Sequence, residues 1–421
     1  MPSFCRRLSL VPVLIAAYLP PAQIAHGQAA LTWDQVVQRF QVNNPALNAQ
    51  RTMIEEMRAN EITAGLRPNP QLSLTSDQWA LFSTNPFRPF GAAQTIVSGS
   101  QLIERRRKRP LRIESARLAT DISGTDLADL ERQLRFALRD AFVRLLQANS
   151  VLELSRENMA YYDKVIEVNR RRFETGAMAR SDYERIALQR AQYESDLQTA
   201  IVNVRTAKIQ LLSLMNDNTT PVDTFDVAGT FDFSDKIMLP EELHRAALES
   251  RGDIRSADTL IRKADVDHRL AWANGSWDPQ VGGDYTRVGP SNTLGAFVSI
   301  PVRIFDRNQG EKARTAAEIR RAQQARDAVV NTAFRDIDTA FAQVESVRTV
   351  VRPYRDTYLP QAARVRDSVS YAYSRGGASL LDFLDAQKAY RDTQLAYRNL
   401  IGGYLTAVNQ LNFAVGKEVL E

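Results

Sequence analysis

The chain contains two tandem copies of one sequence plan, which start about 200 residues apart. The segment 174–193, ETGAMARSDYERIALQRAQY, aligns without a gap with the segment 374–393, SRGGASLLDFLDAQKAYRDT. At this offset the following residues correspond: Gly176 with Gly376, Asp182 with Asp382, and Tyr183 with Phe383. Similarity at a fixed spacing indicates that one structural unit is repeated. The fold must therefore contain the same order of elements twice.

Each copy is predicted to begin with an interrupted helix, at residues 33–64 and again at residues 241–273. The interruptions fall near Pro45 in the first copy and near Gly252 in the second. A residue that precedes proline avoids the helical conformation, which gives the first interruption a local cause.

The longest predicted helices are residues 111–173 and 311–373, which are rich in Ala, Arg, Glu, Gln and Leu. At 1.5 Å per residue, each would reach roughly 95 Å, far more than a globular core needs. A turn at Gly176, or at Gly376 and Gly377, then reverses the chain. The return helices are predicted at residues 181–215 and 380–415. Each copy therefore ends in a long antiparallel helical hairpin.

Four short strands are predicted, two directly before each long hairpin. They occupy residues 71–78, 94–103, 280–288 and 294–305. In the last of them, every second side chain from Leu294 to Ile304 is apolar, which is typical of a strand with one face against lipid or a core. Strands of about 9 to 11 residues suit a membrane barrel, and about eight strands make the smallest common barrel. Four strands would therefore have to share a barrel with strands from other chains.

The first 29 residues differ in composition from the rest of the chain. Arg6 and Arg7 precede a short apolar run, which small residues around Ala25 follow. This order is typical of a secretory signal peptide, and the apolar run is shorter than the roughly 20 residues of a membrane-spanning helix. We therefore expect the protein to be exported. Cleavage would remove Cys5, the single cysteine of the chain.

Composition and motifs argue against several classes of function. The chain has 54 basic and 49 acidic residues, a balance that does not suggest a nucleic-acid partner. No glycine-rich phosphate loop, GxSxG or HExxH motif occurs, and His244 and His268 lie apart without a cluster of metal ligands. We therefore expect no enzyme activity, no cofactor and no metal site.

These features divide the chain into five predicted segments. They are a signal peptide (1–29), a first repeat (30–216), a connector (217–240), a second repeat (241–416) and a C-terminal tail (417–421).

Three motifs, together with the repeat, carry a resemblance to a known family. They are LRPNPQL (66–72), IPVRIFDRNQGEKA (300–313) and LLDFLDAQ (380–387). The chain resembles the TolC family of outer-membrane efflux factors of Gram-negative bacteria, from about Leu31 to Gly416. The segment IPVRIFDRNQG is similar in particular to members that serve heavy-metal-type RND efflux pumps.

The resemblance implies a mainly α fold with a small β part. In the family, three chains form a homotrimer and each gives four strands to a shared 12-stranded transmembrane β-barrel. The long antiparallel hairpins of the family form an α-barrel in the periplasm. By this resemblance the chain lies in the outer membrane, in contact with its lipid, and extends far into the periplasm.

The resemblance also implies a function and partners. The chain is expected to be the exit duct of a tripartite efflux or type I secretion system, conducting substrates passively. The implied partners are a periplasmic adaptor (a membrane fusion protein) and an inner-membrane RND or ABC pump.

The two hairpin tips are the site that the resemblance implies. Family tips close the periplasmic end of the duct and dock onto the adaptor. The turn residues of the tips are Gly176, Ala177, Gly376 and Gly377. The motif LLDFLDA aligns with a ring of acidic residues at the entrance, which gives this role to Asp382 and Asp385. The alternative is two solvated carboxylates near a helix N-terminus, where the helix dipole favours them.

A latch between the tips is implied by the same alignment. Ser181, Asp182 and Tyr373 fall where family residues hold the closed tips together. The arginine that completes the family's latch corresponds to Ala378 here. Either Arg180 or Arg375 replaces it, or this entrance is held less firmly than in the family.

A second class of protein shares several of these features. A wholly periplasmic coiled-coil adaptor, or an envelope-spanning structural protein, would also have a signal peptide and helical hairpins. Neither would explain a pair of strands that recurs directly before each long hairpin.

Overall fold

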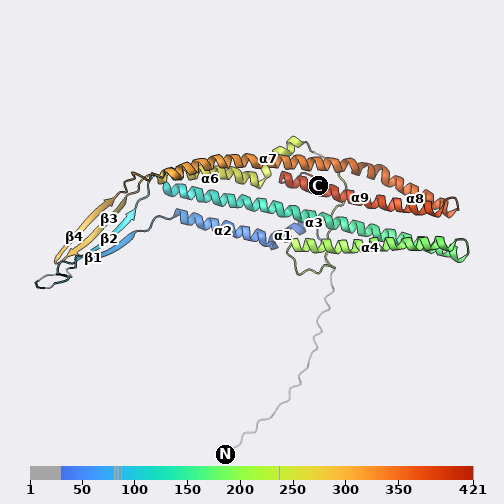
Figure 1. The fold of residues 1–421 in the computed structure, drawn as a ribbon, viewed down its shortest axis with the longest axis horizontal. Helices are drawn as coiled ribbons and strands as arrows, with labels where there is room; N and C mark the ends of the chain where they lie inside the picture. Colours follow the sequence, from blue (N-terminus) through green and yellow to red (C-terminus); the bar gives the residue numbers. More distant parts are fainter. Residues whose placement is uncertain (1–29, 80–81, 83–84, 87, 237, 421) are drawn as a thin grey trace, which may run out of the picture.

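A computed structural model describes residues 30–420, apart from residues 80–81, 83–84, 87 and 237. The predicted signal peptide at residues 1–29 lies outside the described residues. The described chain is elongated and gently curved, with the strands at one end and two helical hairpin tips at the other (Figure 1). The prediction of a mainly helical chain with a small antiparallel sheet is confirmed.

Each half of the chain begins with two consecutive helices, where the sequence predicts one interrupted helix. They are α1 (Trp33–Asn43) and α2 (Pro45–Gly65), then α5 (Pro240–Ser250) and α6 (Gly252–Asn274). The side chain of Asn44 accepts hydrogen bonds from the backbone N–H groups of Ala46 (3.0 Å) and Leu47 (3.1 Å). Pro45 occupies the first position of α2, where an N–H would have no helical partner. Asn44 therefore separates the two helices and caps the second.

Two long antiparallel hairpins make up most of the remaining chain. The first consists of α3 (Lys108–Glu174) and α4 (Arg180–Leu214). The second consists of α7 (Gln309–Pro353), a π-helical turn (Tyr354–Tyr358), α8 (Leu359–Ser374) and α9 (Leu380–Val415). Pro353 and Pro360 flank the π-helical turn, and neither has an N–H for the helical ladder. The chain keeps helical backbone angles there, so the predicted helix at 311–373 is one continuous path.

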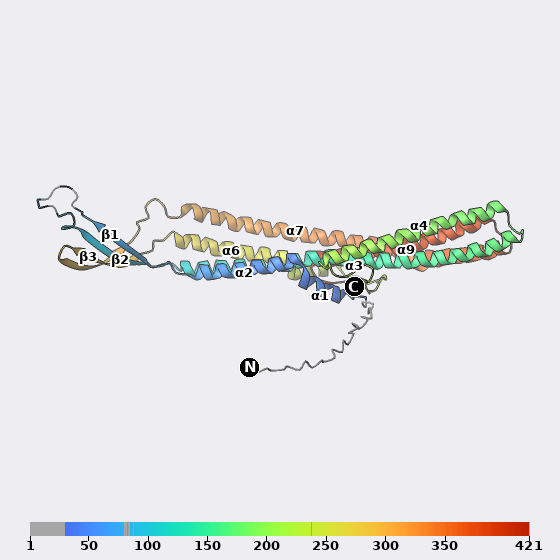
Figure 2. The same cartoon turned by 90° about the horizontal axis from the view of Figure 1, so that it is seen from below.

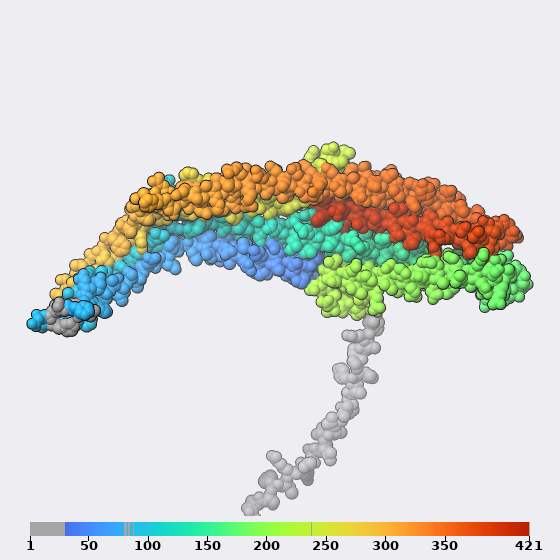
Figure 3. Space-filling model, in the orientation of Figure 1, coloured from blue at the N-terminus to red at the C-terminus, as the bar shows by residue number. Residues whose placement is uncertain are grey.

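The helices form one curved wall. In the space-filling view α7 runs along one edge, α2 and α4 run along the other, and α3 and α9 lie between them (Figure 3). The second ribbon view again shows the two hairpin tips together, far from the sheet (Figure 2). Leu138 and Leu145 of α3 are fully buried in one cluster with Leu211 of α4. No helix among the described residues is both long enough and apolar enough to cross a membrane.

The sheet joins the two halves of the chain. Its antiparallel strands, in spatial order, are β1 (Gln71–Asp77), β2 (Gln94–Leu102), β3 (Gln280–Val288) and β4 (Ser291–Ser299). The pairing of β2 with β3 links the first half of the chain to the second. Within the described residues, the outer edges of β1 and β4 have no strand partner.

The fourth strand is shorter at its C-terminal end than the sequence predicts. The alternating pattern runs to residue 305, whereas β4 ends at Ser299. Pro301 follows two residues later and cannot donate a hydrogen bond to a sheet ladder. Val302 and Ile304 lie in the following loop and are exposed. The prediction of a strand over residues 300–305 is therefore wrong.

Candidate functional site: the two hairpin tips

Both tips have the same backbone turn. In the first tip Gly176 adopts a positive φ of 72°, and its N–H donates to the carbonyl of Phe173 (3.0 Å). The N–H of Ala177 donates to the carbonyl of Arg172 (2.8 Å). This pair of bonds is a Schellman motif, which ends a helix with a left-handed residue. In the second tip Gly376 (φ 79°) and Gly377 make the same two bonds, so the predicted turn residues occupy equivalent positions.

An aromatic stack closes each tip. Phe173 stacks on Tyr183 in the first tip, with ring centroids 5.2 Å apart and an angle of 7° between the planes. Tyr373 stacks on Phe383 in the second tip, at 4.7 Å and 20°. Each stack joins the last turns of the outgoing helix to the first turns of the returning helix. The two aromatic pairs lie at the same offset as the sequence repeat.

Tyr373, one of the predicted latch residues, contacts the first hairpin of its own chain. Its hydroxyl donates to Oδ1 of Asn169 (3.2 Å), a buried side chain of α3. The guanidinium of Arg172 lies over its ring, 5.2 Å from the centroid. The pKa of Tyr373 is raised overall, chiefly by burial. The charge of Arg172 lowers this pKa, and the carboxylate of Asp182 raises it further. Tyr373 therefore links the two hairpins within one chain.

The other predicted latch residues, Ser181 and Asp182, lie in the first turn of α4. Within the described part of the chain, neither side chain forms a hydrogen bond or an ion pair. Arg180, a possible substitute for the missing latch arginine, pairs instead with Glu184 of its own helix (2.8 Å). The other substitute, Arg375, lies over the ring of Tyr371. The structure thus brings Tyr373 against the first hairpin, but the side chains of Ser181 and Asp182 form no hydrogen bond or ion pair with Tyr373.

Asp382 and Asp385 lie on the first turns of α9, and both side chains are exposed. Asp382 belongs to a capping box with Ser379, the N-cap residue of α9. Its backbone N–H donates to Oγ of Ser379 (3.1 Å), while the backbone N–H (3.1 Å) and hydroxyl (2.7 Å) of Ser379 donate to Oδ2 of Asp382. These bonds to the charged form lower the pKa of Asp382. Asp385 has no hydrogen-bonding or ionic partner among the described residues.

The first tip lacks this box, although its backbone is arranged in the same way. Ala179 is the N-cap residue of α4 and has an extended backbone (φ −69°, ψ 148°) close to that of Ser379 (φ −76°, ψ 162°). Asp182 lies at the same helical position as Asp382, but alanine offers it no hydroxyl. The two tips therefore differ in how firmly their returning helices are capped.

Polar contacts hold the helices together near the tips. No pattern in the sequence predicted them. The amide of Gln387 on α9 donates to the hydroxyls of Tyr161 on α3 (3.1 Å) and Ser370 on α8 (3.0 Å). Tyr162 is fully buried, stacks on Tyr193, and donates its hydroxyl to the carbonyl of Ile186 (3.0 Å). The tips are therefore held in place by specific contacts behind the turns.

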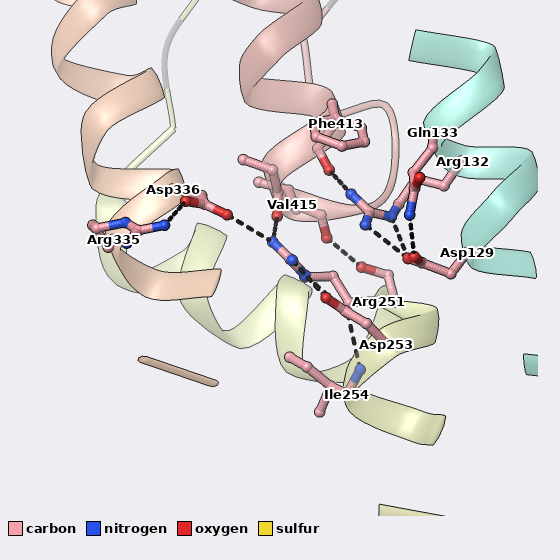
Figure 4. Close-up of polar contacts among 12 residues, drawn as sticks. Asp129, Arg132, Gln133, Arg251, Asp253, Ile254, Arg335, Asp336, Phe413 and Val415 are labelled. Carbon is pink, nitrogen blue, oxygen red and sulfur yellow. Dashed lines mark hydrogen bonds and ion pairs between the residues drawn. The ribbon is translucent and has the colours of Figure 1, made fainter. Parts of the chain in front are cut away.

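A second polar cluster lies where α9 ends, at the opposite end of this helix from the tip (Figure 4). The last helical carbonyls of α9 are satisfied one by one. Arg132 donates to the carbonyl of Phe413 (2.8 Å), Arg251 to that of Ala414 (2.9 Å), and Ser250 to that of Val415 (2.6 Å). Positive charges at this position also complement the helix dipole. The cluster joins α3, α5, α6 and α9.

Arg251 is the most buried charged residue of this cluster, with 5% of its surface exposed. It also binds the carboxylate of Asp253 in a bidentate manner, at 3.0 and 2.7 Å. Burial alone would raise the pKa of Asp253, but the hydrogen bonds and charge of Arg251, together with Arg132, lower it overall. No local sequence pattern predicts this cluster, because its members come from distant segments of the chain.

The described residues contain no group of three or more His, Cys, Asp or Glu side chains placed to hold a metal ion. The two described histidines have ordinary partners. His244 contacts Asp338 (2.8 Å), and His268 contacts Thr315 (2.8 Å) and Trp272 (3.1 Å).

Comparison with known proteins shows that this chain is similar to outer-membrane efflux proteins. Residues 243–417 match the family model described as outer membrane efflux protein. The cobalt-zinc-cadmium resistance protein CzcC of Cupriavidus metallidurans is 23% identical, over 89% of this chain and 87% of its own length. The outer membrane efflux protein BepC of Brucella suis is 22% identical, over 91% of this chain and 85% of its own length.

Solved structures share the fold. A membrane protein from Pseudomonas aeruginosa has a TM-score of 0.74 at 19% identity, covering 91% of this chain and 90% of its own. The outer-membrane channel OprN has a TM-score of 0.73 at 16% identity, covering 91% and 89%. The alternative of a wholly periplasmic coiled-coil protein is not favoured, because these relatives are outer-membrane efflux proteins and channels. Residues 243–417 therefore form an outer membrane efflux protein domain, and most of the chain is homologous to CzcC and BepC.

Proposed function

We propose that three copies of this chain form an exit duct through the outer membrane. The observation that carries the proposal is the four-stranded sheet, which has one apolar face and two unpaired edges. Three such sheets joined edge to edge give a closed 12-stranded barrel, which leaves no unpaired strand in the membrane. The long hairpins then form an α-barrel that extends into the periplasm.

The proposed duct conducts passively and works with two partners. A periplasmic adaptor docks onto the hairpin tips around Gly176, Ala177, Gly376 and Gly377, and an inner-membrane RND or ABC pump supplies the energy. The exposed turns support this role, because they lie at the end of the molecule farthest from the sheet (Figure 1). The Cupriavidus relative is named a cobalt-zinc-cadmium resistance protein. On this basis we propose that divalent metal cations pass through the duct of this chain.

The periplasmic entrance is proposed to carry a ring of carboxylates from Asp382 and Asp385. The capping box uses only Oδ2 of Asp382, so Oδ1 of Asp382 and the whole carboxylate of Asp385 remain available. Carboxylate rings of this kind favour cations. Ser181 and Asp182, which have no bonded partner within the described chain, are proposed to close the entrance against a neighbouring chain, with Tyr373 fixing the hairpin behind them.

Conductance of the purified protein in planar bilayers tests this function. The wild type should give cation-selective steps, and the double variant Asp382→Ala/Asp385→Ala should lose part of that selectivity. Unchanged selectivity in the variant would disprove the acidic entrance but keep the duct. Well-folded wild-type protein that gives no channels would disprove the duct itself.

A further inference from the structure

The two faces of the sheet differ sharply in chemistry, and the strand register assigns each residue to a face. One row across the sheet reads Leu74, Val97, Tyr285 and Leu294, in which each residue pairs with the next. All four side chains are exposed, and Leu294 is 86% exposed. Contiguous exposed apolar side chains on a strand surface are typical of a lipid-facing barrel wall.

The neighbouring row lies on the opposite face, because successive strand residues alternate. It reads Ser73, Ser98, Asp284 and Gly295. The hydroxyls of Ser73 and Ser98 are 2.7 Å apart, which confirms that the row shares one side of the sheet. Further along this polar face, Gln280 donates to the hydroxyl of Ser100 (2.6 Å). The polar face is the one that would line the lumen of the proposed duct.

Charge is scarce in the four strands. They contain only Asp77, Asp284 and Arg287 as charged residues. The register places both aspartates on the polar face and Arg287 on the apolar face, near the loop end of β3. Asp77 is the last residue of β1, whereas Asp284 lies in the middle of β3. No basic residue of the strands therefore shares a face with Asp284.

The backbone opposite Asp284 is built to leave room for its carboxylate. Gly295 pairs directly with it across the β3–β4 ladder. A Cβ atom at Gly295 would lie 2.6 Å from Oδ1 and 3.1 Å from Oδ2 of Asp284, so a side chain there would displace the carboxylate. The hydroxyl of Thr286 donates to Oδ2 at 3.2 Å, and no described residue forms an ion pair with Asp284. The carboxylate therefore has no basic partner on the polar face among the described residues.

From this placement we infer that Asp284 lines the lumen at mid-height of the strands and favours cations over anions there, as a second selective position remote from the hairpin tips. The inference rests on the proposed function, because three chains are needed to bring three Asp284 side chains around one lumen. It concerns hydrated cations in transit, not a tight binding site. Fixed charges in a confined lumen with low-dielectric walls raise the local concentration of counter-ions.

The test is the reversal potential of purified channels in planar bilayers under a tenfold KCl gradient. Near 10 mM salt, charges act over about 30 Å, whereas near 1 M they act over about 3 Å. The near-isosteric variant Asp284→Asn should lower the ratio of cation to anion permeability by about threefold at low salt and have little effect near 1 M. Arg287→Gln, a charge change on the apolar face, is the matched control and should leave the ratio unchanged.

Three outcomes are distinguishable. A drop in selectivity for Asp284→Asn alone supports the inference. Channels of normal conductance whose selectivity is the same in wild type and Asp284→Asn would overturn it and leave the proposed duct intact. Absence of channels from folded wild-type protein would overturn the duct, and the inference with it.

Discussion

The capping box of the second hairpin tip gives the sharpest local prediction. The substitution Ser379→Ala removes the hydroxyl that accepts from the N–H of Asp382 (3.1 Å) and donates to its carboxylate (2.7 Å). Loss of an N-cap side chain costs about 1 kcal/mol of helix stability. Because 1.4 kcal/mol corresponds to about a tenfold change in an equilibrium constant, local opening of the first turn of α9 should become about fivefold more frequent.

The first tip supplies the opposite experiment. Ala179 already has the extended backbone of an N-cap residue, and Asp182 lies three residues after it. The substitution Ala179→Ser should therefore create the missing box and stabilise the first turn of α4 by about 0.5 to 1 kcal/mol. Hydrogen exchange followed by mass spectrometry, on peptides covering residues 379–386 and 179–186, measures both changes. Exchange should accelerate only in the second tip for Ser379→Ala, and slow only in the first tip for Ala179→Ser.

The box also predicts a dependence on pH. The pKa of Asp382 is lowered in the folded tip, so its contribution to stability is complete above the ordinary aspartate pKa and is lost as the pH falls through the lowered value. In Ser379→Ala this acid-dependent part should shrink. Unchanged exchange at both tips in both variants would show that the box does not stabilise the tip, because the two backbones are matched and only the hydroxyl differs.

Three further predictions concern the rest of the chain. Arg251→Ala leaves a partly buried carboxylate and a helix-end carbonyl without their partner, so it should cost about 3 kcal/mol and lower the thermal midpoint, while Arg251→Lys costs less. The pKa of Asp217 is lowered to about 2, chiefly by the hydroxyl of Thr220, and titration followed by NMR should find it there. The stability that Asp217 contributes should be lost as the pH falls towards that value. Thr220→Val should raise the pKa of Asp217. Leu294→Lys, on the apolar face, should cost about 2 to 4 kcal/mol and reduce the amount of assembled protein in outer membranes, whereas Thr293→Lys on the polar face should be tolerated.

The repeat was the part of the fold that the sequence predicted best. Turn glycines and aromatic residues act within a few residues of one another, so the offset that aligns Gly176 with Gly376 also aligns the two Schellman turns. The same offset pairs Tyr183 with Phe383, and both rings stack on the aromatic residue before the turn. Local chemistry repeated in sequence gives local structure repeated in space.

Three features were predicted less well from the sequence, or not at all. The apolar alternation that starts at Leu294 continues past the end of β4. A side-chain pattern does not show which backbone groups are paired, so it overestimated the length of the strand. Pro301 was the sequence signal that the strand ends earlier. The capping box has a sequence signal, a serine three residues before an aspartate. Only the effect of the helix dipole was predicted at this position. The cluster around Arg251 depends on α3, α6 and α9 meeting, which no local pattern specifies.

In the proposed duct, one chain supplies only a part of a membrane wall that three chains complete. This is tested by the mass of the assembly extracted from outer membranes in a mild detergent, corrected for bound detergent. We expect a mass of three chains in the outer-membrane fraction. A mass of one chain, or protein recovered only from the periplasm, would contradict the proposed trimer. The edges of β1 and β4 would then not be paired with strands of other chains.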